Sequence, residues 1–300
     1  MKRVIRLLSV FICIVLFASI AFGCGKQSDQ PKEAKGIFYK VEKDGKYLYL
    51  GGSIHLGDDK IKFSDKVENA YKESNKLGVE IDITDPGISD KLSKEMIYTD
   101  GDNLDKHLKP ETKEYVTKLL GEIGVKYNGE ITKLKPWALQ STISVLQYSA
   151  SGFKTNNGLD MIFISRAKSD NKAIVSLEDF DTQYKAISYG DDEFQNANLM
   201  KLTKVTETKK QLQDLYAAVV NGDTEYVEKT SGEMKSGDRM FKDYYDAMVT
   251  KRNLKMETKI EEYLKSNDKY FIIVGAGHVV GEDGLVTLLK DKGYTVTRLE

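Results

Sequence analysis

Two of the three histidines in this 300-residue sequence lie in the same short motif, in which a glycine precedes a histidine by three positions. Gly52 and His55 form the first copy, and Gly275 and His278 form the second. An imidazole can bind a divalent transition metal or carry a proton near neutral pH. The repeated motif therefore predicts a metal-binding or acid–base site, provided that the fold brings the two copies together.

Acidic residues at the ends of two expected strands could complete such a site. Glu80 and Asp82 close one of these strands, and Glu178 follows the other. Imidazole and carboxylate ligands together suit Zn²⁺, Mn²⁺, Co²⁺ or Fe²⁺. Such an ion polarises a carbonyl group and lowers the pKa of its bound water toward about 7. A glutamate that is not a ligand could then act as the general base.

Each of these residues also has an ordinary structural interpretation. The histidines could bond loop carbonyl groups, Glu80 could be an ion-paired or helix-capping carboxylate, and Asp82 could be a turn residue. The third histidine, His107, is expected on the surface of a helix. The sequence has no His-Glu-x-x-His, P-loop, Gly-x-Ser-x-Gly or paired-cysteine motif, so none of these better-known chemistries competes.

Both motifs follow apolar stretches with the length and composition of strands. Residues 36–41 and 47–50 flank an Asp-Gly turn and predict a hairpin. Further strands are expected at 76–82, 173–177, 270–274 and 294–299, the one at 173–177 being buried, with helices beginning near Ser64, Pro136, Gly158 and Asp283. Strand–helix–strand order after both motifs predicts parallel βαβ units, whose ligand sites form beyond the carboxyl ends of the strands.

Residues 36–300 are predicted to form one α/β domain. We expect a central mixed or parallel sheet, flanking helices and two pseudo-repeated βαβ halves. Residues 192–265 are expected to form a charged, mainly helical segment. The 45 basic and 46 acidic residues give a formal net charge of −1, which predicts no nucleic-acid partner.

The N-terminus has the features of an export signal. Lys2, Arg3 and Arg6 precede an uncharged apolar run over residues 7–22, which is shorter than the ~20 residues that span a bilayer comfortably. A basic start, a short apolar run and small residues near the cut are typical of a secretory signal. Residues 1–23 are therefore predicted to be a signal peptide.

The predicted cut lies before Cys24, in a sequence that resembles a bacterial lipobox, although Ala21 and Phe22 depart from the usual leucine and small residue. Cys13 lies within the signal, so the mature chain would keep no pair of thiols for a disulfide. Lipid on Cys24 would anchor the protein to the cell membrane on its extracytoplasmic face. The polar residues 24–35 predict a disordered tether. An ordinary cleaved signal is the alternative.

Three stretches of the sequence resemble the TraB/PrgY/GumN family, which is related to the Tiki membrane proteases. They lie at residues 51–82, at 134–183 and at 252–294, and they include Gly52-Ser-Ile-His55, Lys135-Pro-Trp137 and Gly275-Ala-Gly-His278. From the first to the last, they span nearly all of the chain from about residue 36 to residue 298. One departure follows the first motif, where the family often has prolines and this chain has Lys62-Phe63-Ser64.

The resemblance implies a fold like that of erythromycin esterase and the ChaN haem-binding lipoprotein. It also implies a metal-dependent hydrolytic centre built from His55, His278 and Glu80. Glu178 and Arg252 match further polar positions of the family pattern. Glu178 could support the metal ligands or act as the base, and Arg252 could bind a substrate carboxylate or an oxyanion.

The leading hypothesis is an extracytoplasmic metal-dependent hydrolase, with a peptidase as the first choice and Mn²⁺, Co²⁺ or Zn²⁺ as the cofactor. Its partners would be a peptide or small-molecule substrate and, through the lipid, the membrane. The alternative is a non-catalytic lipoprotein of the cell envelope that binds a peptide or haem. A third hypothesis is a structural role at the envelope with an inert site.

Overall fold

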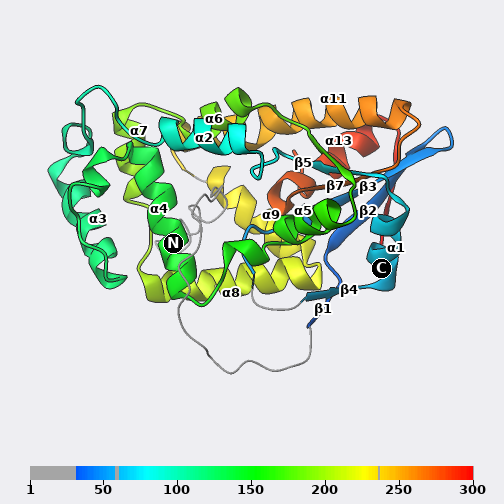
Figure 1. Cartoon of the computed structure of the whole chain (residues 1–300), viewed down its shortest axis with the longest axis horizontal. Helices are drawn as coiled ribbons and strands as arrows, with labels where there is room; N and C mark the ends of the chain where they lie inside the picture. Colours follow the sequence, from blue (N-terminus) through cyan, green and yellow to red (C-terminus); the bar gives the residue numbers. More distant parts are fainter. Residues whose placement is uncertain (1–31, 58–60, 236, 300) are drawn as a thin grey trace.

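The computed structural model describes residues 32–57, 61–235 and 237–299 (Figure 1). The predicted signal peptide and the lipidation expected on Cys24 lie outside these residues. None of the helices formed by the described residues is long and apolar enough to cross a membrane.

A hairpin begins the central sheet, as the Asp-Gly turn predicts. β2 (Ile37–Lys43) and β3 (Lys46–Ser53) pair in antiparallel fashion. Asp44 and Gly45 between them have φ values of 53° and 75°. Positive φ at both central residues is the mark of a type I′ turn, whose twist matches that of the flanking strands.

The main sheet is mixed and has six strands in the order β6-β5-β7-β3-β2-β8. The remaining strands are β5 (Lys76–Val79), β6 (Ala173–Ser176), β7 (Tyr270–Gly275) and β8 (Thr295–Arg298). β6, β5, β7 and β3 are mutually parallel, whereas β2 is antiparallel to both β3 and β8. The predicted α/β class with a mixed sheet is therefore confirmed.

The predicted pseudo-repeat of two βαβ halves is not confirmed. The next strand of the main sheet after the first histidine motif, β5, lies one strand away from β3, with β7 between them. The strand after the second motif, β8, lies at the far edge of the sheet, beyond β3 and β2. The two motifs thus lead into unlike connections, and only their positions at adjacent strand ends correspond.

Helices cover both faces of the sheet, and consecutive residues of β7 show how. Phe271 packs with Tyr71 of α1 (Asp65–Glu73) and Phe163 of α5 (Leu159–Ser169). Tyr270 points to the opposite face, since side chains alternate along a strand. It stacks there on Tyr263 of α11 (Lys251–Lys265), with ring centroids 4.4 Å apart.

Further helices extend the molecule away from the sheet, and Figure 1 shows α3, α4 and α7 at the end opposite to it. Leu119, Leu139 and Leu199 from these helices belong to a separate apolar cluster. The predicted helical segment 192–265 is confirmed by α7, α8, α9, α10, a π-helical turn at Asp246–Thr250, and α11. The bounds not yet given are α2 Pro86–Glu95, α3 Pro110–Glu122, α4 Pro136–Ala150, α6 Phe180–Ile187, α7 Asp192–Leu199, α8 Val205–Asn221, α9 Thr224–Gly232, α10 Arg239–Tyr245, α12 Ala276–Val279 and α13 Leu285–Asp291.

Three local expectations need correction. The segment 24–35, expected to be a disordered tether, contains β1 (Lys32–Ala34), which pairs in parallel with β4 (Ile61–Phe63). The strand at 173–177 was expected to be buried, but β6 is an edge strand and is only partly covered. His107 follows a short 3₁₀ turn (Leu104–Lys106) instead of lying on a helix surface, and it is half-buried.

Candidate active site

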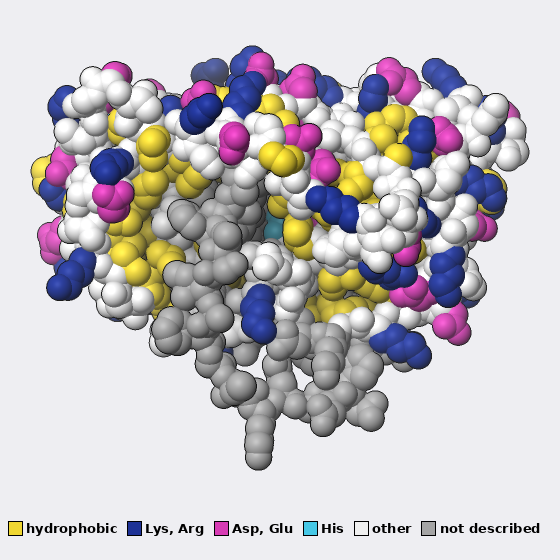
Figure 2. All heavy atoms as spheres, viewed as in Figure 1, with side chains coloured by type: hydrophobic (Ala, Val, Ile, Leu, Met, Phe, Trp, Pro, Cys, Tyr) yellow, Lys and Arg dark blue, Asp and Glu magenta, His cyan; other side chains and the backbone are white. Residues whose placement is uncertain are grey.

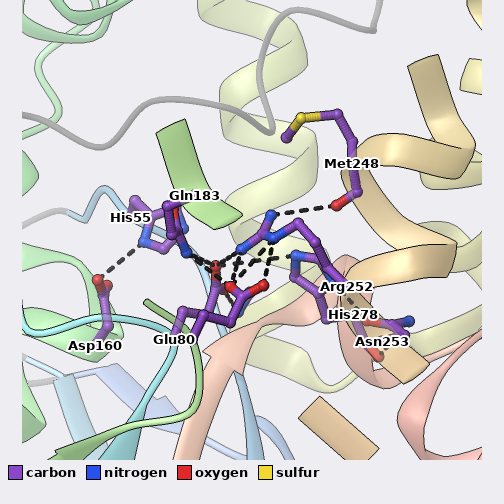
Figure 3. Close-up of polar contacts among 10 residues, drawn as sticks. His55, Glu80, Asp160, Gln183, Met248, Arg252, Asn253 and His278 are labelled. Carbon is purple, nitrogen blue, oxygen red and sulfur yellow. Dashed lines mark hydrogen bonds and ion pairs between the residues drawn. The ribbon is translucent and has the colours of Figure 1, made fainter. Parts of the chain in front are cut away.

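Four parallel neighbours, β6, β5, β7 and β3, end at the same edge of the sheet. The residues that follow them are Glu178, Glu80, His278 and His55. The structure therefore brings the two histidine motifs and both glutamates together, although His55 and His278 are separated by more than 200 residues in sequence. Figure 3 shows the side chains of His55, Glu80 and His278 converging with Arg252 of α11.

His55 is held by a carboxylate from α5. Its Nδ1 lies 2.9 Å from Asp160 Oδ2, and Ser53 Oγ donates to Asp160 Oδ1 at 2.9 Å. Burial alone would lower the pKa of His55, but the charge and hydrogen bond of Asp160 and the charge of Glu80 raise this pKa to about 9. His55 is therefore an imidazolium at neutral pH, with a side chain that is 30% exposed.

A glycine makes room for this pair. A Cβ atom on Gly158 would lie 2.8 Å from the carbonyl carbon of His55 and 2.8 Å from Asp160 Oδ1. Such contacts are closer than carbon atoms normally approach, so only glycine lets the start of α5 meet the first motif. This explains physically why the sequence Gly158-Leu-Asp160 accompanies the first histidine.

Glu80 lies near both histidines, and each of its carboxylate oxygens accepts hydrogen bonds from other parts of the site. Its Oε1 accepts from the Gly275 N–H at 2.6 Å, and its Oε2 accepts from Arg252 at 2.6 Å and from Gln183 at 3.1 Å. Burial opposes ionisation, but His278, which is protonated at the low pH where Glu80 titrates, acts with the charges of Arg252 and His55 and with the Gly275 hydrogen bond to hold the pKa of Glu80 well below its usual range. Glu80 is therefore a carboxylate at any physiological pH.

Glu178 and Arg252 form a buried ion pair beneath Glu80. Arg252 Nε donates to Glu178 Oε1 at 2.9 Å, and its second terminal nitrogen donates to Glu178 Oε2 at 2.6 Å. The Glu178 side chain has no exposed area, and that of Arg252 is 6% exposed. Burial raises the pKa of Glu178 despite Arg252, whereas Glu80 and Glu178 together outweigh burial and raise the pKa of Arg252.

His278 has a neutral partner instead of a carboxylate. Its Nδ1 lies 2.6 Å from Asn253 Oδ1, and its Nε2 lies 3.9 Å from Glu80 Oε2. Burial and the nearby Arg252 charge lower the pKa of His278 to about 3, although Glu80 acts in the opposite direction. The two motif histidines therefore differ in charge at neutral pH, because His278 is an uncharged imidazole.

These groups face a cavity of about 60 Å³. Its polar side is formed by His55, Glu80, Arg252 and His278. Apolar side chains from the helical segment line the other side, namely Leu215, Val219, Met234, Met248 and Val249. Figure 2 shows histidine atoms inside a hollow on the face that it views. A reactive group in this cavity would thus be partly shielded from water.

Gly275 marks the point where the side chains converge. A Cβ atom on Gly275 would lie 3.2 Å from Glu80 Oε1, 3.5 Å from His278 Cδ2 and 3.9 Å from His55 Nε2. The glycine keeps this space open and also donates its N–H to Glu80. Two imidazoles and one carboxylate therefore share one small volume.

A divalent metal fits the chemistry of these donors, but the described geometry is not that of a metal site. Both histidines use Nδ1 for a fixed partner and leave Nε2 for the cavity, which is the usual arrangement of metal-bound histidines. Within residues 32–57, 61–235 and 237–299, however, no three His, Cys, Asp or Glu side chains are placed to hold a metal ion. Glu80 is committed to Arg252 and Gly275 instead.

Sequence reasoning identified the central residues but missed several of their partners. Asp160, Gln183 and Asn253 were not proposed for the site, yet each bonds a central side chain directly. Their positions in the family-like stretches were the available signal. Asp82, named among the acidic candidates, is a turn residue whose Oδ1 accepts from the Thr84 N–H at 2.9 Å.

Comparisons with known proteins show what the chain is similar to. The model of the TraB/PrgY/gumN family matches residues 37–298. The uncharacterized protein YbaP of Escherichia coli (strain K12) is 21% identical over 247 residues, which cover 82% of this chain and 88% of YbaP. A metalloprotease TIKI homolog of Amphimedon queenslandica is 44% identical over 54 residues, 17% of this chain and only 11% of that relative. No solved structure matches the chain.

Proposed function

The chain belongs to the TraB/PrgY/gumN family, and from this premise we propose that it is a hydrolase acting on peptide bonds at the cavity between His55, Glu80 and His278. One observation carries the proposal. Two imidazoles and an ionised carboxylate from three parallel strand ends converge on the open space at Gly275. Such convergence of polar groups in a partly apolar cavity is characteristic of catalytic sites. The short match to a protein named as a metalloprotease supports the same reaction class.

The cofactor that suits these donors is a divalent ion such as Mn²⁺, Co²⁺ or Zn²⁺. His55 and His278 would hold it through their Nε2 atoms, together with Glu80. When bound, such an ion polarises the scissile carbonyl group and acidifies a water molecule. Because Asp160 favours the protonated form of His55, and a ligand imidazole must be neutral, cation binding should release protons.

The residues of the chain itself have separable tasks in this proposal. Arg252 holds the Glu80 carboxylate ionised and in place, and its guanidinium can also bind a developing oxyanion in the cavity. Glu178, considered above as a general base, lies behind Arg252 without exposed area. We therefore assign Glu178 to positioning Arg252 and leave Glu80 as the carboxylate nearest to the reacting atoms.

The cavity favours a peptidase over the haem-binding alternative. A haem macrocycle needs a planar slot between its axial ligands, but Glu80, which is bonded to Arg252 and to the Gly275 N–H, borders the same space as His55 and His278. Peptide binding without hydrolysis is compatible with the same apolar wall, so the experiment below includes it as an outcome. The place of action that we propose is the extracytoplasmic face of the cell membrane, with the chain anchored through lipid on Cys24.

The test is metal binding and peptide hydrolysis by the full chain and three matched variants. We expect about one equivalent of Co²⁺ or Mn²⁺ per wild-type chain and hydrolysis within a mixed-sequence peptide library. His55→Ala and His278→Ala should lose both by at least ~100-fold. His107→Ala, which removes the one histidine outside the site, is the control and should retain both.

Two outcomes would contradict the proposal. Equal cation binding by all four proteins would place the metal elsewhere and end the metal-dependent mechanism. Peptide binding that depends on His55 and His278 but yields no cleaved product, with or without added metal, would replace the hydrolase by the non-catalytic binding protein.

A further inference from the structure

Asn253 contacts the second histidine motif through every polar atom of its side chain. Its Oδ1 lies 2.6 Å from His278 Nδ1, and its Nδ2 donates to the carbonyl oxygens of His278 at 3.2 Å and Asp283 at 2.6 Å. The residue has no exposed area. It follows Arg252 directly in α11, so one helix supplies both the cation of the site and this amide.

The orientation of the Asn253 amide is determined by its neighbours. Carbonyl oxygens accept hydrogen bonds and cannot donate them, so the two that face Asn253 require the NH₂ group. The opposite orientation would place Oδ1 against both carbonyl oxygens and would leave a single hydrogen bond in place of three. Burial makes that loss costly, because a buried polar group without a partner keeps its full desolvation penalty.

The orientation of the amide in turn determines where His278 carries its proton. Asn253 Oδ1 is an acceptor, so Nδ1 of the imidazole must be the donor. In a neutral imidazole the other nitrogen then has a lone pair. For His278 that nitrogen is Nε2, which faces the cavity 3.9 Å from Glu80 Oε2.

We propose that Asn253 is a positioning residue that fixes His278 as the Nδ1–H tautomer and thereby presents an Nε2 lone pair to the cavity. The use of this lone pair, as a metal ligand or a proton acceptor, rests on the proposed function. The tautomer itself does not depend on that function.

The first histidine motif shows what is specific about this arrangement. His55 is held by the carboxylate of Asp160, which stabilises a positive imidazole. Asn253 is neutral and tied to two backbone carbonyls, so it fixes the ring without favouring a positive charge. In the first copy of the motif, the histidine is bonded to a charged carboxylate. In the second copy, the histidine is bonded to a neutral amide.

The direct test is the ¹⁵N spectrum of the three imidazole rings in the metal-free full chain at pH 7.5. With only three histidines, His55→Ala and His107→Ala assign the signals by elimination. We expect His278 to show a protonated Nδ1 and an unprotonated Nε2. A protonated Nε2 on this ring, alone or as part of an imidazolium, would overturn the proposal, and this measurement needs no variant at residue 253.

Variants then distinguish a role of Asn253 in positioning His278 from a role in the stability of the fold. Asn253→Leu removes the acceptor and should leave His278 as a mixture of tautomers, with Co²⁺ affinity lowered by about 10–100-fold. Asn253→Asp keeps an acceptor beside Nδ1 but adds a negative charge, so it should favour a positive His278 ring with both nitrogens protonated, as Asp160 does for His55. Asn196→Leu is the matched control, since the Asn196 side chain is also buried and donates to two carbonyls, those of His107 and Asp192, both at 2.7 Å.

Asn196→Leu should alter stability but neither the His278 spectrum nor the Co²⁺ affinity. If it lowers Co²⁺ affinity as much as Asn253→Leu does, the role of Asn253 is only structural and the proposal fails. If the His278 tautomer is as expected while no peptide is cleaved, the hydrolase proposal fails and the assignment of Asn253 stands. The two conclusions are thus distinguished by separate measurements.

Discussion

Arg252 is the single residue on which the buried charges of the site depend. It carries the only positive charge in direct contact with both Glu80 and Glu178 among the described residues. Removing one member of a buried ion pair leaves the other without compensation, which is far more costly than losing an exposed pair. The same side chain is therefore important for stability as well as for the proposed reaction.

We predict that Arg252→Met lowers the free energy of unfolding by about 3–5 kcal/mol. Arg166→Met is the comparison, because Arg166 also makes two bonds to one carboxylate, that of Glu68, but both side chains are over a quarter exposed. It should cost about 1 kcal/mol, including lost packing. Urea denaturation of both variants measures this, and equal losses would show that burial of the Arg252 pair is unimportant.

A second prediction at this scale concerns the open space at Gly275. Gly275→Ala places a methyl group 3.2 Å from Glu80 Oε1, while its backbone conformation, with φ of −51°, is accessible to alanine. We expect a folded protein with cation affinity and peptide hydrolysis lowered at least ~10-fold, since small displacements in a catalytic site are costly.

The control for Gly275→Ala is Gly121→Ala on α3, where an added Cβ meets no other atom within 4 Å. Alanine in a helix should stabilise the protein by about 0.5–1 kcal/mol relative to glycine and leave cation binding unchanged. Unaltered affinity in Gly275→Ala would mean that the cavity beside this residue is not where the cation or substrate lies.

The central residues of the site could be predicted from the sequence, but most of the side chains that bond to them could not. His55, Glu80 and His278 could be proposed because each follows a recognisable strand, and parallel strands end together. The partners Asp160 and Asn253 could not be assigned, because each comes from a helix far along the chain from the side chain that it binds. Pairing of this kind depends on helix placement, which local sequence patterns do not contain.

At the scale of elements, hydrogen bonds between side chains connect segments that are distant in sequence. His107 joins the 3₁₀ turn before α3 to the start of α7, with Nε2 2.9 Å from Asp102 and Nδ1 2.9 Å from Asp192. Its ring also stacks on Tyr98 at 4.9 Å. Burial alone would lower the pKa of His107, but the two carboxylates outweigh it and raise this pKa above its usual value.

A raised histidine pKa stabilises the fold below the unfolded-state pKa of about 6.5 and ceases to do so as pH rises through the folded-state value. We therefore predict that His107→Gln lowers the free energy of unfolding by up to about 1 kcal/mol at pH 6 and by clearly less at pH 9. Urea denaturation at both pH values measures the difference. Lys118→Gln, which removes an exposed helical pair with Glu114, should show no such dependence between these pH values.

Strands and long helices could be predicted from sequence, but their finer features could not. The hairpin, β7 and the helical segment after residue 192 follow from apolar periodicity and turn residues. The π-helical turn at Asp246–Thr250, which directly precedes α11, has no pattern of its own in the sequence. π-turns are frequent at functional sites, and this one supplies Met248 and Val249 to the cavity.

At the scale of the whole molecule, the proposed location depends on residues before the described fold. Cys24 lies eight positions ahead of Lys32, where β1 begins. A lipid there would hold the domain close to the membrane surface. The position of the cavity relative to that surface would then determine which substrates can reach it.

We predict that the wild-type protein, expressed in a bacterium that processes lipoproteins, separates into the detergent phase of a cloud-point extraction. Cys24→Ser should move it to the aqueous phase, since membrane attachment would be lost with the lipid. Cys13→Ser, within the predicted signal, is the control and should behave like wild type. A detergent-phase Cys24→Ser protein would indicate an uncleaved signal acting as the anchor.

The central place of β7 in the sheet determines when, during synthesis, the sheet and the site can form. β7 lies between β5 and β3 but is synthesised almost 200 residues after β5. A nascent chain that has not yet reached Tyr270 holds two separate pieces of sheet with open edges, and it lacks His278. With the export that we propose, the site cannot assemble until the chain has crossed the membrane as far as His278. A translation product truncated by even its last 30 residues would be a substrate for quality-control proteases, because unpaired strand edges invite degradation and aggregation.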